Sequence, residues 1–134
     1  MTKQGKFARS YAIELIDIAQ QDLLSAQALS GHKNIRIENV FLLAQQALEK
    51  GLKAVLCWND QAIPFLHDIG VLVAKIEALG IQVPFGYDLN GLSEFATIRR
   101  YTEGKETWTE AEVQAVMNEV QSALHWCQSL ILIP

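Results

Sequence analysis

The chain has 134 residues, half of them hydrophobic and 19% charged, which excludes an intrinsically disordered protein and fits one domain with its own core. We therefore expect a single domain over residues 1–134. The formal net charge of −4 argues against a protein that binds DNA or RNA through many phosphates, because such proteins carry a basic surplus.

Apolar residues at helical spacing predict five helices joined by short connections. The first four are expected over residues 11–29, 35–58, 67–79 and 89–101, and the last begins at Thr109. Gly31 is expected as the C′ residue of the first helix, and Gly80 ends the third. Thr109 and Glu112 form a capping box at the start of the last helix. No stretch alternates with period two, so the sequence predicts an all-α fold, an up-and-down antiparallel bundle of about five helices.

Cysteine usage and hydropathy bear on the compartment. Cys57 and Cys127 lie in apolar helical stretches and are expected to be reduced core thiols. The Cys and His residues fit no metal-site spacing, so no metal or other cofactor is expected. No signal-peptide core follows the basic N-terminus, and the apolar runs are too short to cross a bilayer. We expect a cytoplasmic protein with no membrane contact.

Polar side chains interrupt the apolar surface of the second helix. Gln46, Lys50 and Lys53 recur at i, i+4 and i+7, and Glu49 precedes Lys53 by the four residues of a helical ion pair. By itself this pattern is typical of a solvated helix edge with a weak salt bridge.

Two further clusters carry groups able to contact a ligand. His67 and Asp68 begin the third helix, where capping explains the pair better than catalysis does. Arg99, Arg100 and Tyr101 end the fourth helix and form a compact basic cluster in an acidic chain. They suit the C-terminal end of a helix dipole, and equally a phosphate or base. The residues alone leave these two interpretations of the arginine cluster open.

Several stretches together resemble the HEPN domain family (higher eukaryotes and prokaryotes nucleotide-binding). The most specific is the run QQALEKGLKA at residues 45–54. The others are residues 22–26, 67–69 and 96–101 and the final helix with its capping box. The resemblance covers nearly the whole chain in the right order. It implies a helical bundle similar to the substrate-binding subunit of a nucleotidyltransferase, usually present as a homodimer.

The resemblance also implies a function. Small stand-alone members act with a minimal nucleotidyltransferase, some as toxin–antitoxin modules, and other members are metal-independent ribonucleases with an Arg followed after four to six residues by a His. No His follows Arg99 or Arg100 at that spacing. Cleavage by internal attack of the 2′-OH needs a group that titrates near neutral pH. We therefore expect a non-catalytic HEPN protein that is a dimeric partner of a minimal nucleotidyltransferase.

This protein is expected to contact a nucleotide or RNA rather than DNA. The candidate contact residues are Arg99, Arg100, Tyr101, Lys50, Lys53 and His67. Two alternatives are a ribonuclease with a degenerate site, built from Arg100 with Tyr101 or His67, and a purely structural interaction module. The apolar residues Trp108, Trp126 and 130–133 add a physical reason to expect a dimer, because one edge of a small bundle cannot easily hide them all.

Overall fold

The structure is a computed structural model that describes residues 3–65, 67–85 and 108–131, with side chains from residue 8 onward. Within these ranges the chain forms helices and no strand, which confirms the all-α prediction. The four described helices are α1 (Lys3–Ser30), α2 (Ile37–Trp58), α3 (Ile69–Glu77) and α5 (Glu110–Ile131). The fourth predicted helix, over residues 89–101, lies outside the described residues.

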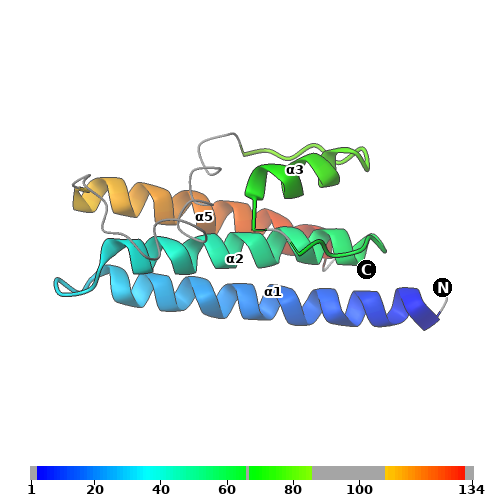
Figure 1. The fold of residues 1–134 in the computed structure, drawn as a ribbon, viewed down its shortest axis with the longest axis horizontal. Coiled ribbons are helices and arrows are strands. Elements are labelled where there is room, and N and C mark those ends of the chain that lie inside the picture. Colours follow the sequence, from blue (N-terminus) through cyan, green and yellow to red (C-terminus); the bar gives the residue numbers. More distant parts are fainter. Residues whose placement is uncertain (1–2, 66, 86–107, 132–134) are drawn as a thin grey trace.

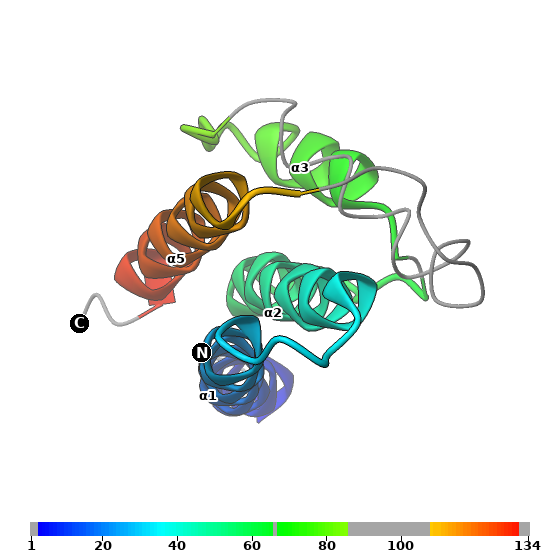
Figure 2. The same cartoon turned by 90° about the vertical axis from the view of Figure 1, so that its left-hand side faces the viewer.

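Helix α2 occupies the centre of the structure (Figure 2), with α1, α3 and α5 arranged around it. Figure 1 shows that α1 runs antiparallel to both α2 and α5. This arrangement follows from the sequence of α2, because a helix that is apolar over most of its circumference must be covered on several sides. None of the described helices is long and apolar enough to cross a membrane.

Helices α1 and α2 share the longest contact. On α1, Ala12, Ala19 and Ala26 are completely buried at intervals of seven residues, and small side chains at this spacing let two helix backbones approach closely. The large side chains of α2 that are fully buried include Phe41, Leu48, Leu52 and Leu56.

Helix α5 approaches α2 closely at Gly51. A Cβ atom placed on Gly51 would lie 2.7 Å from Cδ1 of Leu124 and 3.4 Å from Sγ of Cys127. Side chains of α5 therefore occupy the volume in which a larger residue at position 51 would stand. The glycine within the QQALEKGLKA run thus has a packing role.

The helix ends agree with the sequence in part. The capping box is confirmed: the Thr109 amide donates to Oε1 of Glu112, and the Glu112 amide donates to Oγ1 of Thr109, both at 3.1 Å. Gly80 has the positive φ of a left-handed residue, 85°. Gly31 directly follows the last residue of α1, as the predicted helix end requires, but it has no positive φ.

Helix α1 begins eight residues before its predicted start. Its first turns lack a clear apolar period, but they contact the end of α2. The guanidinium of Arg9 lies 4.8 Å from the centre of the Trp58 ring, and Sγ of Cys57 donates to the Ala8 carbonyl at 2.9 Å. These tertiary contacts extend the helix beyond what local spacing indicates.

Candidate functional site

A row of polar residues is buried along one side of α2, and two of them contact the loop that precedes α3. Glu38, Gln45 and Glu49 are each almost wholly removed from solvent. Their spacing of seven and four residues places them on one side of the helix. Buried polar groups need partners, and for Gln45 and Glu49 an important partner is His67, which immediately precedes the N-cap of α3.

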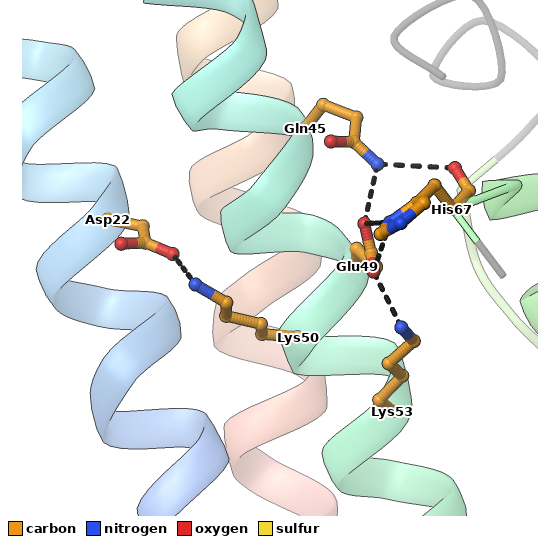
Figure 3. Close-up of polar contacts among 6 residues, drawn as sticks. All are labelled: Asp22, Gln45, Glu49, Lys50, Lys53 and His67. Carbon is orange, nitrogen blue, oxygen red and sulfur yellow. Dashed lines mark hydrogen bonds and ion pairs between the residues drawn. The ribbon is translucent and has the colours of Figure 1, made fainter. Parts of the chain in front are cut away.

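Glu49 is the centre of this cluster (Figure 3). Its Oε1 lies 2.9 Å from Nδ1 of His67 and 2.6 Å from Nζ of Lys53. Its Oε2 accepts a 2.9 Å hydrogen bond from Nε2 of Gln45. The same Gln45 nitrogen also donates to the His67 carbonyl at 3.2 Å. Gln45 therefore binds both the carboxylate of Glu49 and the backbone of His67.

The environment keeps Glu49 ionised. Burial by itself raises the pKa of this carboxyl. Hydrogen bonds from Lys53, His67 and Gln45, together with the positive charge of Lys53, more than offset burial and hold its pKa below the ordinary value of 4.5. Because an ionised carboxylate only accepts hydrogen bonds, Nδ1 of His67 carries the hydrogen that faces Glu49.

Exposure differs strongly within the cluster. The side chain of Glu49 is 7% exposed and that of Lys53 is 12% exposed, whereas the His67 imidazole is 60% exposed. With Nδ1 fixed against Glu49, the Nε2 atom of a neutral His67 is the ring nitrogen left to accept a proton or a hydrogen bond. The cluster thus presents an oriented imidazole on a buried carboxylate.

Comparison with known proteins now adds the family. A scan against protein-family models matches the HEPN domain over residues 12–130, a range that includes Glu49, Lys53 and His67. The chain belongs to the HEPN family. Searches of curated proteins and of solved structures found no significant match. Membership of the HEPN family supports a function related to nucleotides or RNA.

The HEPN chain brings together two of the six predicted contact residues. Lys53 and His67 meet at Glu49, whereas Lys50 turns to the other side of α2 (Figure 3) and pairs with Oδ2 of Asp22 on α1 at 2.5 Å. Lys50 therefore links two helices and does not join the cluster. The other three residues, Arg99, Arg100 and Tyr101, lie outside the described residues.

Two expectations about this region need correction. The Glu49–Lys53 ion pair is confirmed. The prediction that it lies on a solvated edge of the helix is wrong, because both side chains are largely buried. His67 and Asp68 were expected to share a capping role. Only Asp68 caps α3, where its Oδ1 accepts the Val71 amide at 3.3 Å, while His67 reaches back to Glu49.

Gln45 is a site residue that sequence reasoning did not single out. The sequence does contain an indication of its role. Gln45 lies within the apolar stripe that Phe41, Leu48 and Leu52 form, where a buried polar side chain needs hydrogen-bond partners. Figure 3 shows its Nε2 turned toward Glu49 and its Oε1 turned away. That oxygen is buried without a hydrogen-bond partner.

The aromatic residues expected to form a dimer surface pack within the HEPN chain. The rings of Trp108 and Phe41 meet edge to face with centres 4.8 Å apart, and those of Trp126 and Phe85 do so at 5.8 Å. Ile131 is also buried. The homodimer remains a prediction, and Trp108, Trp126 and Ile131 no longer support the physical argument for it; residues 132 and 133 lie outside the described residues.

The described residues offer no evident metal centre. Within residues 3–65, 67–85 and 108–131, no group of three His, Cys, Asp or Glu side chains is placed to hold a metal ion.

Proposed function

We propose that this HEPN protein binds a nucleotide or RNA where His67 stands beside α2, and that it acts as the non-catalytic, dimeric partner of a minimal nucleotidyltransferase. The observation that carries the binding role is the exposed His67 imidazole fixed at 2.9 Å from the buried Glu49 carboxylate. When His67 is protonated, Lys53 and His67 carry two positive charges against one negative charge, so the exposed ring is a suitable contact for a phosphate.

Direct binding tests the first part of this proposal. Fluorescence anisotropy with a labelled single-stranded RNA, and calorimetry with ATP, would measure affinity for the wild type and for His67→Ala. We expect His67→Ala to weaken binding by about fivefold or more, the usual scale for a charge-assisted contact. His32→Ala is the matched control, because His32 is exposed in the connection between α1 and α2, away from Glu49. Equal affinity of wild type and His67→Ala would refute the assignment.

The partner role rests on family membership and on the absence of a His after Arg99 or Arg100 at the ribonuclease spacing. The test is to co-express the protein with the product of the adjacent open reading frame and to purify both. A stable complex with a nucleotidyltransferase supports the proposal. If no nucleotidyltransferase is encoded nearby and none binds, this part fails. Light scattering at micromolar concentration tests the dimer, and a monomeric mass would count against it.

A second candidate, a metal-independent ribonuclease, is favoured by one specific observation. A carboxylate that orients an imidazole through Nδ1 is an arrangement used for general base catalysis. Nε2 of His67 would take the proton of the 2′-OH, the 2′-oxygen would attack phosphorus, and the bond to the 5′-oxygen would break. The leaving 5′-oxygen would take its proton from water.

RNA cleavage in EDTA distinguishes the two candidates. Cleavage that is lost in His67→Ala, reduced in Glu49→Gln and absent with a 2′-deoxy substrate would support the ribonuclease. Wild-type protein that binds RNA and leaves it intact would remove this candidate and agree with the non-catalytic role.

A further inference from the structure

Phe65 lies in the connection between α2 and α3, two residues before His67, and its side chain is completely open to solvent, with a relative exposure of 102%. Of the aromatic side chains that the structure describes, the next most exposed is Tyr11 on α1, at 46%. Full exposure forgoes the hydrophobic stabilisation that a buried ring would give. The ring of Phe65 is therefore available to a ligand beside the candidate site.

The segment that carries Phe65 is attached to the bundle on both sides of the ring. Ile63, two residues earlier, is partly buried against the core. Pro64 follows it and fixes its own φ angle immediately before the ring. Two residues after the ring, Nε2 of Gln45 donates to the His67 carbonyl at 3.2 Å. These attachments hold the backbone near α2 while the Phe65 side chain stays in solvent.

Phe65 and His67 are close enough for one nucleotide to contact both. Two consecutive peptide units span at most about 7 Å, so the Cα atoms of these residues lie within that distance. The Phe65 ring offers an apolar face. The His67 imidazole, 60% exposed, offers a hydrogen-bonding group that is positively charged when protonated. A nucleotide carries the complementary pair, a flat base and a phosphate, joined through one sugar.

Size favours a base over a protein surface as the group that covers Phe65. A stable protein interface buries about 800 Å² on each partner, whereas one aromatic side chain supplies roughly 150–250 Å². In the described part of this region, the next large apolar side chain that is exposed is Val71 on α3, six residues further along. A base, by contrast, needs only the face of one ring, and every base has such a face.

We propose that Phe65 stacks an unpaired nucleobase while the phosphate attached to that base meets His67. This inference rests on the binding role proposed for His67 and extends it by naming the chemical class of the ligand. Bases in a duplex are already stacked between their neighbours, so Phe65 favours single strands or free nucleotides over double-stranded RNA. Stacking on one ring reads no hydrogen-bonding edge, so we expect little sequence preference.

Probes with and without bases separate stacking from the phosphate contact. They are a fluorescein-labelled oligoadenylate of about eight nucleotides, an oligomer of the same length made of abasic sugars, and the oligoadenylate paired with its complement. Anisotropy measures the affinity of the full chain for each. We expect the single strand to bind about tenfold or more tightly than the other two. Calorimetry with AMP shows whether a free nucleotide suffices, whereas binding of the oligoadenylate alone identifies RNA as the source of the base.

Matched variants test the ring itself. Phe65→Ala should weaken binding of the oligoadenylate about tenfold or more and leave affinity for the abasic oligomer within about twofold. Phe65→Tyr keeps the ring and should keep the affinity. His67→Ala should weaken binding of both oligomers, because it removes the phosphate contact. Leu24→Ala is the control, since Leu24 is a large exposed apolar residue in the hollow between α1 and α5. Circular dichroism would establish that each variant is folded.

Several results would overturn the proposal. Unchanged oligoadenylate affinity in Phe65→Ala, with weakened binding in His67→Ala, would refute stacking and leave the function proposed for His67 intact. Equal losses for the oligoadenylate and the abasic oligomer in Phe65→Ala would show that the ring does not contact a base. A wild type that binds none of the probes would refute both proposals. Loss of self-association or of nucleotidyltransferase binding in Phe65→Ala, with oligoadenylate affinity unchanged, would make a protein the group that covers the ring.

Discussion

His67 and Glu49 are joined across the connection between α2 and α3, with Nδ1 of the imidazole 2.9 Å from Oε1 of the carboxylate. The acid is buried in the structure and the ring is open to solvent. The buried carboxylate of Glu49 thus orients the exposed imidazole of His67, which is able to contact a ligand. This pairing also ties the start of α3 to the middle of α2, so it serves both the fold and the candidate site.

Glu49→Gln should lower the free energy of unfolding by about 1–3 kcal/mol, measured by urea denaturation. The amide keeps the size of the side chain but leaves the largely buried Lys53 ammonium without its carboxylate. Glu14→Gln, an exposed acid on α1, is the control and should stay within about 0.5 kcal/mol of wild type. Equal stability of both variants would mean that the buried cluster contributes nothing to stability.

Stability should also depend on pH through Glu49. The pKa of this carboxyl is lowered in the folded protein by its hydrogen bonds, against the effect of burial. A lowered folded pKa gives a stabilisation that is present above the ordinary value of 4.5 and is lost as the pH falls below it. Urea denaturation between neutral pH and pH 3 should show this loss in the wild type. In Glu49→Gln the loss should be smaller; identical pH profiles would contradict the assignment.

The Asp22–Lys50 pair joins α1 to α2 and is partly open to solvent. A double-mutant cycle with Asp22→Asn and Lys50→Met should give an interaction energy of about 0.5–1 kcal/mol, because solvent screens such pairs. The energy should fall when the salt concentration is raised. A larger value that salt does not change would show that the pair behaves as a buried one.

Gly51→Val should destabilise the protein by about 1–3 kcal/mol, because its side chain would overlap Leu124 and crowd Cys127 of α5. Gly31→Val is the comparison, since a Cβ atom at Gly31 meets nothing within 4 Å and should cost about 0.5 kcal/mol or less. Thermal melts of both variants would check this. A melting temperature of Gly51→Val equal to that of the wild type would show that α5 can move away from α2 here without loss of stability.

Neither cysteine should react with a thiol reagent in the folded protein. Burial raises the pKa of the Cys127 thiol, and burial with the negative charge of Asp60 raises that of Cys57. The thiolate is the reactive form, so both should label with Ellman's reagent in urea and remain unlabelled without it. Rapid labelling of the native protein would contradict the burial of both side chains.

Local patterns predicted most of the described fold. The bounds of α2 were predicted to within two residues, because its apolar residues recur through about six helical turns. The capping box was also predictable from the sequence, since Thr109 and Glu112 are only three residues apart. The early start of α1 was not, because Ala8 and Arg9 are held by Cys57 and Trp58, far away in sequence.

The candidate site was less predictable for the same reason. The Glu49–Lys53 pair follows from the spacing of one helix. The contact with His67 depends on the path of the chain after α2, which no local pattern specifies. Lys50 and Lys53 are three residues apart and were grouped together. Three residues fall about 60° short of a full helical turn, so the two side chains leave the helix in different directions. Lys50 pairs with Asp22, and Lys53 pairs with Glu49.

Leu124 packs over Gly51 and also lines an open hollow between α1 and α5. A ligand that displaces this one side chain would change how tightly α5 is held against α2, and a change at position 51 would alter the shape that the ligand meets. Binding and helix packing are then thermodynamically linked, and each changes the free energy of the other by the same amount. The position of Leu124 is therefore shared between the surface of the bundle and its central helix.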